Sequence, residues 1–151
     1  MVQIRFEVET PLPPETVLAT ATDFSERRPE IWSDIDPAKY RVHASGPHSA
    51  DVTEGGKSFG GIWARERYDW STPGTVTAEV QASNVFRSGS RWELRVRPAA
   101  DGGSRIEWTS IRRPNSLRGV IVVLMLRLGG RRYLSAYLRK TLARLERERA
   151  S

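Results

Sequence analysis

The chain has 151 residues and a formal net charge of +6, and this length fits one domain around one core, so we expect residues 1–151 to form a single domain. The longest apolar run, Val120 to Leu126, is far short of the roughly 20 residues that a membrane-spanning helix needs. Cysteine is absent, which excludes disulfides, thiolate metal sites and cysteine nucleophiles.

The chain opens with a period-two pattern, in which Val2, Ile4, Phe6 and Val8 alternate with polar residues. This pattern predicts a strand with one buried face rather than a signal peptide. We therefore expect a cytoplasmic protein.

Prolines end this strand, and one of them can open a helix because a first-turn proline loses no hydrogen bond. We expect a short helix over Glu15–Thr22 and a second one near Ser25–Arg28. A loop that carries Ile31 and Trp32 should follow.

Six further strands are predicted between residues 40 and 112. Short turns separate them, for example Gly46-Pro47 and Asp101-Gly102-Gly103, so the strands should form an antiparallel meander. Their predicted bounds are Tyr40–Ser45, Ser49–Glu54, Gly61–Ser71, Thr75–Ser83, Ser90–Arg97 and Arg105–Arg112.

A long helix is predicted from a cap at Asn115 or Ser116 to about Glu148. Gly129-Gly130 should bend it or split it. One apolar stripe is expected to face the core; it consists of Leu117, Val120, Leu124, Leu128, Leu138, Leu142 and Leu145. Residues 112–151 hold 11 basic and 2 acidic side chains, so the positive charge is concentrated in this last segment.

The order of these elements resembles that of the START-like, or helix-grip, superfamily, and within it the bacterial polyketide cyclase/dehydrase and lipid transport family. The stretches that carry the resemblance are TDFSERRPEIW (22–32), IWARERYDW (62–70), GSRWELRVRP (89–98) and GGSRIEWTS (102–110). The resemblance covers essentially the whole chain.

This resemblance implies an α+β fold in which a curved antiparallel sheet of about six or seven strands grips the C-terminal helix, as in the birch-pollen allergen. A cavity should lie between sheet and helix. Relatives of this kind bind lipids, sterols, polyketides, plant hormones or isoprenoid quinones, and some are cyclases or aromatases.

The predicted ligand-binding residues are the inward-facing side chains of the strands and of the helix, together with two near the entrance. They are Phe24, Trp32, Ile62, Trp70, Trp92, Leu94, Trp108, Leu124, Leu128 and Arg131. Each of the large side chains can instead pack in the core. Arg131 can meet a ligand carboxylate or extend into solvent.

Glu66 and Tyr68 are the weak catalytic candidates. They share one face of the predicted strand 61–71, whereas Arg65, Arg67 and Trp63 share the other, and periodicity does not decide which face is buried. A buried carboxyl group is able to act as a general acid or base. A structural role for Glu66 is the competing interpretation.

The first hypothesis is therefore a carrier or binding protein for a hydrophobic small molecule, and the second is a polyketide cyclase or aromatase. The third is a module that docks on an anionic membrane surface or a protein partner through its apolar, basic helix. We expect no metal, no cofactor and no nucleic acid; a homodimer remains open. A solvated helix face is the alternative to docking.

Overall fold

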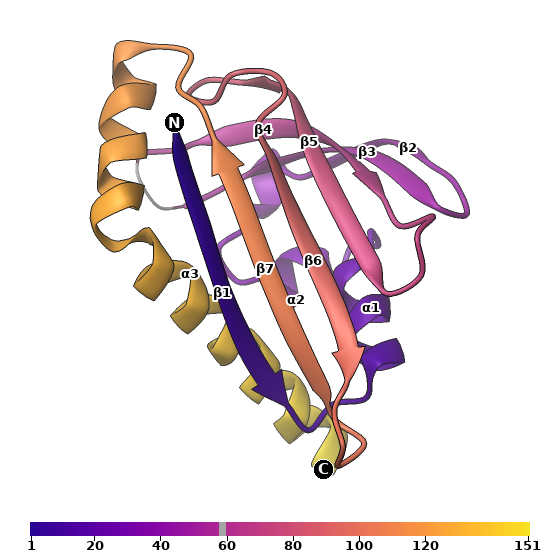
Figure 1. The fold of residues 1–151 in the computed structure, drawn as a ribbon. Coiled ribbons are helices and arrows are strands. Elements are labelled where there is room, and N and C mark those ends of the chain that lie inside the picture. Colours follow the sequence, from indigo (N-terminus) through magenta and orange to yellow (C-terminus); the bar gives the residue numbers. More distant parts are fainter. Residues whose placement is uncertain (58–59) are drawn as a thin grey trace.

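The computed structural model describes residues 1–57 and 60–151. Seven strands, three α-helices and one 3₁₀ turn follow one another in the predicted order (Figure 1). The strands are β1 (Val2–Thr10), β2 (Arg41–Ser45), β3 (Ser49–Gly55), β4 (Trp63–Asp69), β5 (Thr75–Ser83), β6 (Arg91–Pro98) and β7 (Ser104–Arg112). The helices are α1 (Pro14–Ala21), α2 (Arg28–Ile31) and α3 (Leu117–Ala150), with a 3₁₀ turn η1 at Pro37–Lys39.

The strands form one antiparallel sheet in the order β1-β7-β6-β5-β4-β3-β2. Consecutive strands are neighbours from β2 to β7, as the short turns predict, and β1 pairs with β7 at the far edge. Register shifts in β2 and at Arg65/Glu66 in β4 interrupt the pairing, and such bulges increase local twist. Figure 1 shows the resulting curvature.

Alternation of apolar and polar residues buries one face of the sheet. In β1 every even-numbered residue from Val2 to Thr10 is buried and every odd-numbered one is exposed. The same period places Ala64, Glu66 and Tyr68 of β4 inside. Because α3 packs against β1, and α1 against β5 and β6, the buried face becomes the wall of an interior space.

The second short helix begins at Arg28, at the end of the predicted Ser25–Arg28. The residues before it form a turn, in which the Asp23 carboxylate accepts a hydrogen bond from the backbone of Ser25 at 2.9 Å. Pro29 then occupies the first helical turn, a position that proline favours.

Helix α3 is one continuous element of 34 residues, capped by Ser116, whose hydroxyl accepts a hydrogen bond from the backbone of Gly119 at 3.1 Å. Gly129-Gly130 does not split it, and Figure 1 shows its axis changing direction part-way along. Within the described chain, no helix has the combined length and apolarity that crossing a membrane requires.

The predicted core stripe of α3 is wrong in its first half. Leu117, Leu124 and Leu128 are 80%, 49% and 89% exposed. The buried face instead carries Gly119, Val122, Val123 and Gly130, followed by Leu138 and Leu142. The first half has two apolar stripes on opposite faces, and the one with smaller side chains faces the sheet because it permits a closer approach. A Cβ atom on Gly130 would lie only 2.8 Å from Cδ1 of Ile4.

Candidate functional site

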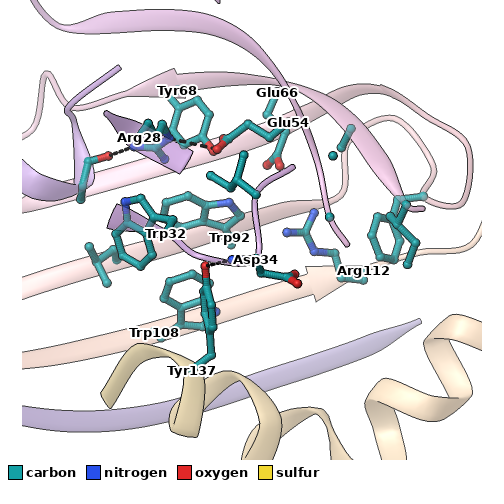
Figure 2. A pocket seen from close by; sticks show the side chains of 18 residues that line it. Arg28, Trp32, Asp34, Glu54, Glu66, Tyr68, Trp92, Trp108, Arg112 and Tyr137 are labelled. Atoms are coloured by element: carbon teal, nitrogen blue, oxygen red, sulfur yellow. Dashed lines mark hydrogen bonds and ion pairs between the residues drawn. The ribbon is translucent and has the colours of Figure 1, made fainter. Parts of the chain in front are cut away.

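A pocket of about 270 Å³ opens between the sheet, the segment after α2 and the middle of α3. Its walls come from β3, β4, β6 and β7, from residues 32–35, and from Tyr137 of α3 (Figure 2). This volume lies just below the roughly 300–1,000 Å³ that is typical of small-molecule pockets. A small ligand of two or three rings suits that size better than a two-chain lipid.

Stacked aromatic rings form one wall. The rings of Trp92 and Trp108 lie 4.8 Å apart between centroids and only 7° from parallel. Phe6 continues the stack behind Trp108, and Tyr68 meets the other side of Trp92 edge-on at 5.6 Å. The register explains this arrangement, because Leu94 of β6 pairs with Trp108 of β7, which makes the two tryptophans diagonal neighbours on one face. The result is an aromatic wall at the pocket.

A buried ion pair supports the opposite wall. Nε of Arg28 donates to Oε2 of Glu54 at 2.9 Å, and Nη1 donates to the backbone carbonyls of Ala21 and Asp23. The Tyr68 hydroxyl donates to the other carboxylate oxygen of Glu54. Arg28 is only 4% exposed and lies over the ring of Phe24 at 4.3 Å. These contacts fix the segment after α1 against β3 and β4.

The same network sets two ionisation states. Burial lowers the pKa of the Arg28 guanidinium, but the charge and hydrogen bond of the nearby Glu54 carboxylate, together with Tyr68, have a larger, opposite effect. The pKa of Arg28 is therefore raised. Burial, together with the negative charge of Glu54, raises the pKa of Tyr68 well above 10. Arg28 is therefore charged and Tyr68 is a neutral phenol whose proton is directed at Glu54.

Glu66 differs from Glu54 because it takes part in none of the ion pairs formed within residues 1–57 and 60–151. It is 7% exposed, and its Oε2 atom is buried without a hydrogen-bond partner in the described structure. Burial raises the pKa of Glu66, with the positive charge of Arg112 opposing that effect. Its carboxyl group therefore stays protonated to a higher pH than an exposed glutamate does, and it points into the pocket (Figure 2).

Three further pocket residues carry buried nitrogen atoms for which residues 1–57 and 60–151 supply no hydrogen-bond partner. These atoms are Nε1 of Trp32, Nε1 of Trp108 and Nη1 of Arg112. Buried polar groups in native proteins are nearly always satisfied, so an unsatisfied set around one space needs an explanation. A bound molecule or water that supplies acceptor atoms is the direct one.

Most of the residues predicted from the sequence surround this pocket: Trp32, Ile62, Glu66, Tyr68, Trp92, Leu94 and Trp108. Phe24 and Trp70 form a second layer, since Phe24 packs edge-on against Tyr68 at 4.7 Å and stacks on Trp70 at 5.8 Å. The open question about β4 is answered, because the face with Glu66 is inside and the face with Trp63 is outside.

The prediction that Leu124, Leu128 and Arg131 line the cavity is wrong. All three are exposed on α3, for the reason given above: the opposite stripe of the helix faces the sheet. The helix contributes Tyr137 to the pocket instead, and the Tyr137 hydroxyl accepts a hydrogen bond from the backbone of Asp34 at 3.1 Å.

Sequence reasoning missed Arg28, Glu54, Arg112 and Tyr137. Arg28 lies in a run of charged residues that looks solvated, and its burial depends on meeting Glu54, 26 residues away. Arg112 could have been found, because it continues the inward-facing set Trp108 and Ser110 along β7. Within the residues that the structure describes, no group of three His, Asp or Glu side chains is placed to hold a metal ion.

A curved antiparallel sheet closed by a long C-terminal helix over an aromatic pocket defines the helix-grip, START-like class. The sequence pattern of the family described as polyketide cyclase / dehydrase and lipid transport matches residues 1–149, and the chain belongs to that family. The family supports ligand binding or a cyclase role in general terms. No curated protein sequence matches the chain.

Solved structures with the same architecture include a START superfamily protein from Mycobacterium smegmatis, which has a TM-score of 0.76 at 14% identity over 95% of this chain and 98% of the other. The Zhui aromatase/cyclase from Streptomyces sp. R1128 has a TM-score of 0.80 at 14% identity over 97% and 94%. Norcoclaurine synthase from Thalictrum flavum, in complex with dopamine and hydroxybenzaldehyde, has a TM-score of 0.71 at 11% identity over 97% and 87%. At these identities the likeness establishes the fold.

Proposed function

We propose that this protein binds and carries a small hydrophobic molecule with at least one planar ring in the pocket beside Trp92 and Trp108. The observation that carries the proposal is the pairing of an aromatic wall with polar atoms around the same space that have no hydrogen-bond partner among the described residues. Ligand pockets combine an apolar lining with a few placed polar groups in this way. The volume of about 270 Å³ favours a compact ligand.

A cavity-filling substitution tests this proposal. Ala64 is 7% exposed and lines the pocket, whereas Ala82 on neighbouring β5 is exposed. We expect 2-naphthol to bind the wild-type protein in isothermal titration calorimetry, with at least about tenfold weaker binding in Ala64→Leu, because added methyl groups occupy the site. Ala82→Leu should bind like the wild type. Equal binding by all three proteins, or by none, would refute the proposal.

Native mass spectrometry of freshly purified protein, beside a denatured control, addresses the natural ligand. A co-purifying mass that is absent after denaturation would identify its class directly.

A second candidate is an aromatase- or cyclase-type enzyme acting on a poly-keto chain. The observation that favours it is the buried carboxyl group of Glu66 at the pocket, whose Oε2 atom has no hydrogen-bond partner within residues 1–57 and 60–151, because a carboxylic acid with a raised pKa can donate a proton to a ketone oxygen. Tyr68 is the weaker acid, since its proton is directed at Glu54. Pocket shape would fold the chain, which needs few special side chains.

Turnover of a poly-ketone by wild type and Glu66→Gln distinguishes the enzyme from the carrier. The enzyme hypothesis predicts a loss of turnover of about 100-fold or more while 2-naphthol binding persists. Unchanged turnover would eliminate Glu66 as the acid, and absence of turnover in the wild type would leave the carrier function alone.

We also propose that the first half of α3 docks on an anionic membrane surface. Six large apolar side chains are exposed there: Leu117, Val120, Ile121, Leu124, Met125 and Leu128. Arginines 118, 127, 131 and 132 flank them, and residues 113–145 include no acidic side chain. Charge complementarity favours anionic lipid over a second copy of the chain, which would bring these arginines together.

Vesicle co-sedimentation tests the docking surface. We expect binding to phosphatidylcholine vesicles only when phosphatidylglycerol is present, and loss of binding in Leu124→Ser/Leu128→Ser, whose exposed positions should leave the fold intact. Binding that ignores the anionic lipid would refute the proposal. So would a dimer in sedimentation velocity that the same double variant dissociates.

A further inference from the structure

Arg112 has a position that the aromatic wall alone does not explain. It follows Trp108 and Ser110 on the inward face of β7, four residues beyond Trp108, which is about 13 Å between Cα atoms at 3.3 Å per residue. Its guanidinium lies over the ring of Phe86 at 5.0 Å and points into the pocket (Figure 2). The stacked rings and the guanidinium therefore line the same space.

The Arg112 guanidinium has no salt-bridge partner among the described residues, although its charge acts on the carboxyl group of Glu66. None of the ion pairs formed within residues 1–57 and 60–151 involves Arg112, and its Nη1 atom is buried without a hydrogen-bond partner. A buried polar atom without a hydrogen-bond partner is costly. A structure that keeps such an atom at a pocket therefore suggests that a ligand supplies the partner.

The three carboxyl groups at the pocket do not supply it. Glu54 is committed to Arg28 and Tyr68. Asp34 already interacts with another residue of the chain. Glu66 has one buried oxygen without a hydrogen-bond partner in the described part of the chain, and burial raises its pKa, so its protonated form can donate a hydrogen bond to an anion. A carboxyl group and a guanidinium thus face the pocket together from β4 and β7 (Figure 2).

We infer that the ligand is a planar aromatic carboxylic acid whose carboxylate binds Arg112 while its rings lie against Trp92 and Trp108. A carboxylate has the planar, two-oxygen geometry that a guanidinium matches. This inference rests on the proposed binding function and specifies its ligand class.

The test compares 2-naphthoate with its neutral analogue 2-naphthamide by isothermal titration calorimetry. The wild type should bind the acid at least about tenfold more tightly, because hydrogen bonds to charged groups contribute about 1.5–3 kcal/mol. Arg112→Gln should abolish this preference while leaving the affinity for 2-naphthamide nearly unchanged. Arg112→Lys, which keeps the charge but not the fork of donors, should keep part of the preference.

Arg113→Gln is the matched control, because it removes the same charge one residue away from an exposed position. It should leave the preference intact, and circular dichroism should show native melting for all variants used. Equal binding of acid and amide by the wild type, or a preference that survives Arg112→Gln, would overturn the carboxylate inference while the binding function stands. Failure of both probes to bind would overturn the binding function and the inference with it.

Discussion

At the residue scale, the Arg28–Glu54 pair bears directly on stability. Both side chains are shielded, with 5% and 12% exposure, whereas the Arg65–Asp51 pair on the outer face of the same strands has 44% and 23%. Removing one partner of a buried pair leaves an uncompensated charge, and exposed pairs contribute little.

We therefore predict that Glu54→Ala lowers the free energy of unfolding by about 3–5 kcal/mol. Asp51→Ala, on the same strand, should lower it by at most about 1 kcal/mol. Urea unfolding measures both. Similar losses in the two variants would show that the Arg28 network does not hold the pocket wall as described.

Glu66 should make stability depend on pH. Burial raises its folded-state pKa above the ordinary 4.5. Below pH 4.5 the carboxyl group is neutral in both the folded and the unfolded chain. As the pH rises, the group ionises first in the unfolded chain. Its contribution to the free energy of unfolding is therefore lost as the pH rises through the folded-state pKa.

Glu66→Gln removes this loss, and we predict that its stability relative to wild type increases between about pH 5 and about pH 8. Glu79→Gln, at an exposed position on β5, should show no such trend. Urea titrations at the two pH values provide the measurement. A flat difference for Glu66→Gln would mean that its carboxyl group is hydrated or paired.

At the element scale, the glycines of α3 have opposite roles. A Cβ atom on Gly119 would lie 2.1 Å from the carbonyl oxygen of Val85, while nothing lies within 4 Å of one on Gly129. We predict that Gly119→Ala destabilises the protein by about 1–3 kcal/mol or more through overpacking. Gly129→Ala should stabilise it by up to about 1 kcal/mol, because alanine favours helix. Thermal melting compares the two, and equal effects would contradict the packing of α3.

The strands could be predicted closely because their apolar residues alternate: β5 was predicted at its observed bounds, Thr75–Ser83. Which face of β4 points inward could not be predicted, because both of its faces carry aromatic and charged residues. The prediction of how α3 is oriented was wrong for a related reason. Hydrophobicity favoured the leucine stripe, whereas close packing against β1 selected the glycine and valine stripe.

The site was predictable only where its residues follow a strand period. Trp92, Leu94 and Trp108 were found because β6 and β7 alternate cleanly. Arg28 and Glu54 were not found in this way, since their burial arises from a tertiary contact between distant segments. The family resemblance predicted the cavity, and the structure reveals the polar groups that face it.

At the scale of the whole molecule, α3 and the loops after α1 close over one face of a curved sheet and leave an aromatic space, around which some polar atoms find no partner in the described part of the chain. The five tryptophans lie in different parts of this architecture. Trp32, Trp92 and Trp108 line the pocket, Trp70 lies in the second layer, and Trp63 is 37% exposed on the outer face of β4.

The central claim is that ligands enter this space, and the indole N–H resonances of ¹⁵N-labelled protein test it most directly. Adding 2-naphthol should shift the resonances of Trp32, Trp92 and Trp108 together in a saturable way, with a smaller change at Trp70 and none at Trp63. Absence of shifts, or shifts confined to Trp63, would contradict the claim that this pocket binds small molecules.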